Sequence, residues 1–291
     1  MLMLIDAFVL AAKAKKSAKH VVVVPPPTPI VDPMLIGTVA ACIVGVLALL
    51  YMLTRTKSQS TYPPAQAKGG CEIVPGKTAL VAIEFQNEFV AQGGKLHPAV
   101  KDVMASTNML AKVRRAAEQV RDAGGKVIHC PLMFKADASD NPNKALGILA
   151  GCAKDRLFTE KTWNAEFCKE MTPMPGDIVV HGKKGLDAFP NTNLEKFLVA
   201  HGIETVALCG FLTNCCVEST MRTACEKGFN VITLTDGCAT VAKEAQEASC
   251  GGTFGMFSTP MTVAEFGRKI AWTPLTLAEV AMTPSQRSVK F

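Results

Sequence analysis

The sequence predicts an α/β protein: a parallel β-sheet with helices on both faces, preceded by an N-terminal transmembrane helix. From residue 71 onward, short apolar runs alternate with longer amphipathic runs, as strands alternate with helices in such a sheet. Glycines at 124–125, 228 and 251–252 follow the amphipathic runs, where helices commonly end. Ahead of this region, residues 34–53 are uncharged and mostly apolar.

Five short runs are expected to form strands buried on both faces. Each is apolar and rich in β-branched residues, as in parallel sheets that helices cover. Ligands of such sheets bind outside the carboxyl ends of the strands, so functional side chains are expected directly after each strand. The strands are expected at 79–85, 126–131, 177–181, 205–210 and 230–236, and the helices near 99–123, 143–152, 190–201, 215–228 and 241–250.

The apolar run at 34–53 is predicted to cross a membrane once. Twenty helical residues at ~1.5 Å each span about 30 Å, the thickness of the hydrocarbon core. Tyr51 lies near one end, and Arg55 and Lys57 follow it, as residues at a membrane interface do. A cleaved signal peptide is the alternative, because Ala65-Gln66-Ala67 resembles a cleavage motif. However, the run is longer than the apolar core of most signal peptides and starts late.

The other segments are a basic and Pro-rich N-terminal segment (1–33), a flexible linker (54–70), the large domain (71–275) and a C-terminal tail (276–291). Residues 1–20 suit a membrane-surface helix, a targeting peptide or a frayed terminus equally well. Ten of the eleven cysteines lie after residue 70 without the spacing of a disulfide framework. We therefore expect the large domain to face the cytosol, with membrane lipid as a partner of residues 34–53.

The placement of charge argues against a nucleic-acid partner. The formal net charge is +6. Residues 1–70 hold seven basic and two acidic residues, which gives +5, and the remaining 24 basic and 23 acidic residues sum to +1. The large domain is therefore nearly neutral and lacks the basic field that nucleic acid requires.

Chemically active side chains follow three of the predicted strands. Glu84 ends the first, and a buried carboxylate there needs a partner such as Lys183, which follows the third. After the fourth strand, Asn214 favours a helix N-cap, which puts Cys215 and Cys216 in the first turn. That position lowers a thiol pKa, and its free N–H groups can hold an oxyanion. The interpretation is a catalytic trio; the alternative is a buried cysteine, a surface lysine and a structural ion pair.

Four ordered segments match a known family. They are G-x-x-T-x-x-C-V-x-x-T-x-R-x-A at Gly210, Thr213, Cys216, Val217, Thr220, Arg222 and Ala224; I-[DE]-x-Q-N-x-F at 83–89; K…AF…T-x-L at Lys183, Ala188, Phe189, Thr192 and Leu194; and an aspartate, Asp236, at the end of the next strand. Together they resemble the isochorismatase-like cysteine hydrolase superfamily over about residues 77–271.

The resemblance implies a three-layer, Rossmann-like fold and a Cys–Lys–acid triad. Cys216 would attack a carbonyl carbon, Glu84 would take the thiol proton and later activate water, and Lys183 would stabilise the thiolate and position the acid. The reaction would be C–N hydrolysis through a thioester. It also implies a cis peptide, expected at Leu212–Thr213, that aims the N–H groups of Thr213 and Cys216 at the oxyanion.

The acid, the cysteine and the lysine of the triad each raise a question about residue identity. The acid is Glu84 where the family has aspartate, and the extra methylene moves the carboxylate by up to about 1.5 Å, which matters for catalysis. Because adjacent side chains point in different directions, only one of Cys215 and Cys216 faces the pocket. Cys216 is favoured because it directly precedes Val217. Lys183 is favoured over Lys184 by its spacing from Phe189.

The residues expected to line the substrate pocket are Phe89, Trp163 and Phe189. For each of them, packing in the hydrophobic core is the alternative. No metal and no other cofactor are expected, because the region after the second strand, 129–135, lacks the D-x-H segment of metal-dependent nicotinamidases. The expected substrate is a small ureido, carbamoyl or amide compound. The resemblance also implies a homo-oligomer, either a dimer or a tetramer.

Two other functions stay open at this stage. The substitution of glutamate for aspartate and the added anchor suit a catalytically inactive binding or scaffold module tethered to a membrane. The Cys215-Cys216 pair suits a redox-responsive protein, although adjacent cysteines close a strained ring.

Overall fold

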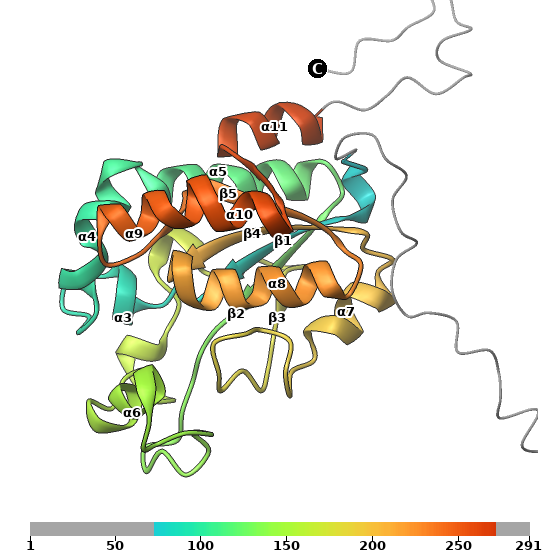
Figure 1. Ribbon diagram of the computed structural model, residues 1–291. Helices are drawn as coiled ribbons and strands as arrows, with labels where there is room; N and C mark the ends of the chain where they lie inside the picture. The colour runs from blue at the N-terminus through green and yellow to red at the C-terminus, as the bar shows by residue number, and fades with distance from the viewer. Residues whose placement is uncertain (1–72, 272–291) are drawn as a thin grey trace, which may run out of the picture. The chain divides into compact units, whose positions relative to one another are not determined.

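The computed structural model describes residues 73–271, which fold around one six-stranded sheet in which all paired strands are parallel (Figure 1). The strand order is β3-β2-β1-β4-β5-β6. The chain therefore moves outward from β1 on one side, returns to β4, and moves outward on the other side. The strands are β1 (Thr78–Ile83), β2 (Lys126–Cys130), β3 (Ile178–Val179), β4 (Thr205–Phe211), β5 (Asn230–Ala239) and β6 (Thr259–Met261).

Helices cover both faces of this sheet. Helix α5 packs against β1, β2 and β5 and against α11, whereas α8 packs against β5 and α10 (Figure 1). The helices are α3 (Asn87–Val90), α4 (His97–Ser106), α5 (Met109–Asp122), α6 (Gly147–Lys154), α7 (Leu194–Ala200), α8 (Glu218–Glu226), α9 (Lys243–Ala248), α10 (Phe254–Phe257) and α11 (Val263–Ala271), with π-helical turns η4 (Thr213–Val217) and η5 (Ser249–Thr253) and 3-10 turns η1 (Pro75–Lys77), η2 (Trp163–Ala165) and η3 (Lys169–Met171).

The central strands are buried on both faces. Every residue of β1 and of β4 is buried, and α5 fills its inner face with apolar side chains. Burial on two sides explains why these strands read as continuous apolar runs without alternation.

The structure confirms the parallel sheet between helices and corrects several boundaries. The single helix expected at 99–123 is two helices, because Asn108 adopts the left-handed conformation (φ 52°) that interrupts a helix. Only two residues of the run 177–181 form β3. Strand β6 was not expected, because three residues that include Pro260 carry no periodic signal.

The predicted terminal segments lie outside the described residues. These are the N-terminal segment 1–33, the membrane span 34–53, the linker 54–70 and the tail 276–291. Within residues 73–271, no helix combines the length and the hydrophobicity that crossing a membrane requires. The anchor therefore stays a prediction from the sequence.

The strand order reverses between β1 and β4, and this reversal positions the site. Ile83 pairs with Gly210 near the ends of these strands, so the residues that follow them leave the sheet side by side. Gly210 permits this approach: its φ is +130°, and a Cβ there would lie 2.0 Å from the carbonyl oxygen of Ile83. Open α/β sheets bind their ligands at such a reversal.

Candidate active site

Glu84 leaves β1 in an unusual backbone conformation. Its φ is +58°, in the left-handed region that non-glycine residues seldom occupy and that clusters at functional sites. Its amide donates to the carbonyl oxygen of Cys130 at the end of β2, at 3.1 Å. The side chain is 1% exposed, so this carboxylate is held inside the protein at the end of the central strand.

Lys183 supplies the opposite charge. Its ammonium forms a hydrogen-bonded ion pair with Glu84 Oε1 and donates to the carbonyl oxygen of Gly185 at 2.8 Å. Burial by itself lowers the pKa of Lys183. The charges of Glu84 and Cys216 and the hydrogen bond to Glu84 outweigh that effect, so the pKa lies above its ordinary value. The buried lysine is therefore a fixed positive charge beside Glu84.

Lys184 points elsewhere. Its ammonium donates to the carbonyl oxygen of Met133 and pairs with Asp140 at 2.6 Å. Of the two neighbouring lysines, Lys183 is thus the one that pairs with Glu84.

Cys216 lies in the turn η4 between β4 and α8. The carbonyl oxygen of Leu212 accepts the amides of Cys215 (3.0 Å) and Val217 (3.2 Å), which folds this turn back on the strand end. Thr220 fixes the next turn by donating to the carbonyl oxygen of Cys216 at 2.8 Å. Cys216 is buried and lines a cavity together with Glu84, whereas Cys215 is half-buried and does not line it.

The pKa of Cys216 differs from the sequence expectation. A hydrogen bond with Cys215, then burial and the negative charge of Glu84, raise the pKa of Cys216 well above its ordinary value, against the opposing effect of Lys183. The same hydrogen bond lowers the pKa of Cys215. The expected stabilisation of a free thiolate at the helix start is thus outweighed by the hydrogen bond with Cys215, by burial and by the charge of Glu84. The resting Cys216 is a thiol that needs a base.

The cis peptide lies one residue earlier than expected, at Phe211–Leu212 instead of Leu212–Thr213. Strand β4 stays paired through Phe211, which faces Ala239 of β5, so the chain leaves the sheet one residue beyond the predicted strand end. The Thr213 hydroxyl donates to Gln246 Oε1 at 2.6 Å and therefore faces the protein interior.

The cavity beside Cys216 has a volume of about 260 Å³. Of the three predicted wall residues, Phe89 lines it, and its ring stacks on Phe211 with centroids 5.0 Å apart. Trp163 is 49% exposed and lines a separate cleft with Glu88 and Asn164. Phe189 stacks on Phe229 instead (6.2 Å). Trp163 and Phe189 are therefore not walls of this cavity.

Helix α6 supplies walls that the sequence did not predict. Leu149 and Cys152 line the cavity from this helix, and Leu157 lines it from just beyond. The sequence predicted a helix near 143–152, in the long connection between β2 and β3, but not which of its side chains face the site. Burial raises the pKa of the Cys152 thiol to about 11.

The isochorismatase domain model matches residues 78–265. The chain belongs to the isochorismatase family. The ureidoacrylate amidohydrolase RutB of Rhizobium rhizogenes is 28% identical over 234 residues, which cover 76% of this chain and 94% of that protein. RutB of Methylorubrum extorquens is 34% identical over 170 residues, which cover 55% of this chain and 68% of that protein.

Solved structures also resemble this isochorismatase-family chain. A cysteine hydrolase from Pseudomonas syringae pv. phaseolicola has a TM-score of 0.61 and 25% identity, covering 72% of this chain and 97% of its own. The N-carbamoylsarcosine amidase from Thermoplasma acidophilum has a TM-score of 0.52 and 25% identity, covering 64% and 96%.

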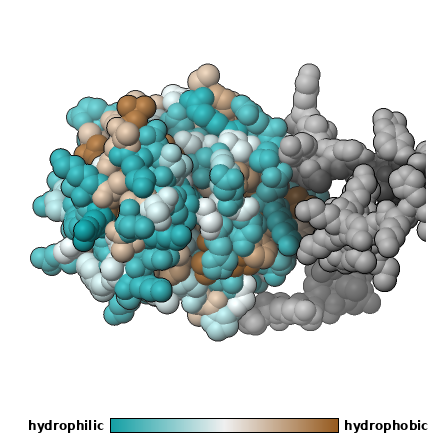
Figure 2. Space-filling model, turned by 90° about the horizontal axis from the view of Figure 1, so that it is seen from below, coloured by the Kyte–Doolittle hydropathy of each residue, from teal (hydrophilic) through white to brown (hydrophobic). Residues whose placement is uncertain are grey.

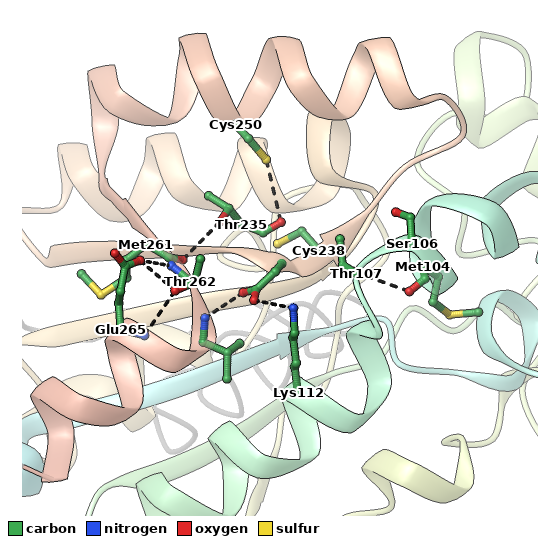
Figure 3. A network of polar contacts seen from close by, with 12 residues as sticks. Met104, Ser106, Thr107, Lys112, Thr235, Cys238, Cys250, Met261, Thr262 and Glu265 are labelled. Carbon is green, nitrogen blue, oxygen red and sulfur yellow. Dashed lines mark hydrogen bonds and ion pairs between the residues drawn. The ribbon is translucent and has the colours of Figure 1, made fainter.

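Other motif residues of this family member are structural. Gln86 donates to the carbonyl oxygens of Leu132 and Ala165, each at 2.8 Å, and so fixes the loop after β2. Asp236 pairs with Lys112 at 2.9 Å and accepts the Val263 amide at 2.7 Å. Figure 3 shows Lys112 reaching into this polar network, with Thr262 and Glu265 at the start of α11 beside it.

Proposed function

We propose that this chain cleaves a C–N bond of a small amide, ureido or carbamoyl compound through a thioester on Cys216. As a family member with amidohydrolase relatives, it is a hydrolase that acts on C–N bonds. The observation that carries the finer proposal is the convergence of Cys216 and Glu84 on one cavity, with Lys183 paired to Glu84.

The acylation step begins with a proton transfer. Glu84 takes the proton of the Cys216 thiol as the sulfur attacks the carbonyl carbon, and the carbonyl electron pair moves to its oxygen. The raised pKa of Cys216 means that the thiolate forms only as it reacts. When the tetrahedral intermediate collapses, the C–N bond breaks and Glu84 returns the proton to the leaving nitrogen. The product is ammonia or an amine, and the acyl group stays on sulfur.

The second step uses the same base for water. Glu84 removes a proton from a water molecule whose oxygen attacks the thioester carbon. The C–S bond then breaks, the sulfur regains a proton from Glu84, and the carboxylic or carbamic acid leaves. Lys183 keeps Glu84 oriented in both steps and balances its charge, since the pair is buried and fixed by Gly185.

Stabilisation of the oxyanion is assigned to the start of the helix after β4. The first N–H groups of a helix have no partner within it, and here the amides of Cys215 and Val217 bond to Leu212. The amides of Thr213 and Cys216 are the donors we propose for the oxyanion. No step requires a metal, because the three side chains supply nucleophile, base and charge.

Glu84 itself favours an enzyme over an inactive scaffold. Because Glu84 has one methylene more than aspartate, its carboxylate must still reach the site. In the structure the side chain both contacts Lys183 and lines the cavity. The membrane tether and a dimeric or tetrameric state stay predictions from the sequence.

Two adjacent thiols provide a matched test. The full-length protein is screened for ammonia release from a panel of small amides and ureido compounds. Cys216→Ala should lower kcat/KM by at least about 10³-fold, because it removes the nucleophile. Cys215→Ala should retain most of the activity. Equal losses from both variants, or no turnover anywhere in the panel, would overturn the proposal.

A further inference from the structure

The wall of the cavity beside Cys216 is almost entirely apolar, and its charged members are both acidic. Glu84 lies at its base, and Asp155 is exposed to solvent. Across residues 73–271, no lysine, arginine or histidine lines this cavity. The aliphatic part of the wall includes Leu96, Val100, Leu132, Leu149, Leu157 and Leu186.

Three nearby cations are already engaged. The ammonium of Lys183 is held by Glu84 and Gly185, and that of Lys184 pairs with Asp140. The ammonium of Lys95 donates to a backbone carbonyl, that of residue 155, at 2.5 Å. None of these three lysines lines the cavity, so none is placed to pair with a substrate carboxylate.

The rim of the cavity is apolar as well. Ile148 is 50% exposed and Val241 is 56% exposed, and both line the cavity, so they lie between its interior and solvent. Figure 2 views the molecule from the lower side of Figure 1, where α6 lies, and shows apolar patches interrupting a largely hydrophilic surface. A substrate therefore passes over apolar side chains before it meets Cys216.

We infer that the substrate is an uncharged amide or ureide carrying an aliphatic or aromatic group; this inference rests on the proposed function. A carboxylate placed in this cavity would lose its water and find no cationic partner, with the charge of Glu84 nearby. The two RutB relatives named above act on ureidoacrylate, which carries a carboxylate. This chain thus differs from them in the charge of its substrate.

Matched pairs of amides test the inference with the full-length protein. Ammonia release is measured for hexanamide against adipic acid monoamide, and for benzamide against 4-carbamoylbenzoate, with Cys216→Ala as the background. The uncharged member of each pair should have a kcat/KM at least 100-fold higher. Equal values, or a preference for the anions, would overturn the inference and leave the proposed function standing. No turnover above background for any of the four would instead overturn the proposed function, and the inference with it.

A charge placed in the wall tests the same inference from the opposite side. Leu149→Arg puts a cation into the cavity and should shift the ratio of anionic to uncharged kcat/KM by at least 10-fold toward the anion. Leu146→Arg, at a 71% exposed position just before α6, is the matched control and should leave the ratio unchanged. Circular dichroism establishes that both variants fold. An unchanged ratio in folded Leu149→Arg would contradict the assignment of this cavity to the substrate.

Discussion

Two carboxylates of the sheet, Glu84 and Asp236, have different surroundings. Glu84, just past β1, is buried against Lys183 and faces the cavity that Cys216 lines. Asp236, in β5, pairs with the half-exposed Lys112 and accepts the amide of Val263 at the start of α11. Both lie in segments that resemble the same family. Only Glu84 faces space that a substrate can occupy, whereas Asp236 joins helices.

The backbone separates the two sites as well. Glu84 sits in the left-handed region, which costs a non-glycine residue on the order of 1–2 kcal/mol, whereas Asp236 lies in β5 where the pairing with β4 shifts register. Strain of this kind persists where the surrounding structure holds the residue in place. A motif thus locates a carboxylate, while its partners and the adjoining space decide its role.

The largest effect is expected from removing the cation of the buried pair. Lys183→Met leaves Glu84 buried and unpaired, so the protein should lose about 3–5 kcal/mol of unfolding free energy and at least about 10³-fold in kcat/KM. Lys184→Met, the matched control, should change each far less. The double variant Glu84→Gln/Lys183→Met should regain stability without regaining activity, as urea titrations and ammonia release would record. Recovery of activity would contradict a catalytic role for the pair.

A large effect on rate is also expected from changing the acid itself. Glu84→Gln keeps the shape of the side chain but cannot accept a proton, so kcat/KM should fall by about 10²–10⁴-fold. Glu84→Asp keeps the base but withdraws it by one methylene, and a loss of about 10–100-fold is expected. The two variants are compared by initial rates on one substrate. An aspartate variant as active as the wild type would show that the reach of Glu84 is not needed.

Asp236→Asn is expected to affect stability and to leave the rate nearly unchanged. It weakens the pair with Lys112 and the hydrogen bond from Val263, so the free energy of unfolding should fall by about 1–2 kcal/mol. The value of kcat/KM should stay within about threefold of the wild type, because Asp236 is not a cavity residue. A loss of rate comparable to that of Glu84→Gln would erase the distinction between the two carboxylates.

The smallest effect is a pH dependence of stability away from both sites. Burial lowers the pKa of His129, and this outweighs the opposing effect of its 3.0 Å contact with Asp177. As the pH falls through ~6.5, His129 therefore takes up a proton more readily in the unfolded chain than in the folded protein. The free energy of unfolding consequently decreases as the pH falls from 7.5 to 5.5. We expect a loss of about 1 kcal/mol in urea titrations. His129→Gln, which cannot titrate, should reduce it; an unchanged slope would assign the dependence to other groups.

The relative positions of Glu84 and Cys216 could be predicted from the sequence because parallel strands end at one edge of the sheet. The choice of Lys183 over Lys184 followed from motif spacing, and the ion pair with Glu84 agrees with it. The motif spacing placed the cis peptide within one residue of its position at Phe211–Leu212.

The cavity wall was the least predictable part. Phe89 follows β1 directly and lines the cavity, whereas Trp163 and Phe189 come from irregular connections whose paths depend on tertiary contacts. Leu149 and Cys152 lie in a helix that the sequence predicted, but nothing in the sequence placed that helix beside the site. The raised pKa of Cys216 likewise depends on its hydrogen bond with Cys215, on burial and on the charge of Glu84, which a sequence position does not specify.

The proposed thioester on Cys216 is best tested by finding which of the two adjacent sulfur atoms carries the acyl group. The full-length enzyme is quenched in acid during turnover of an amide that it hydrolyses, digested, and sequenced by fragmentation mass spectrometry across 211–222. We expect the mass of the acyl group on Cys216 and none on Cys215, with no hydrolysis in Cys216→Ala. An acyl group on Cys215, or continued hydrolysis in Cys216→Ala, would contradict it.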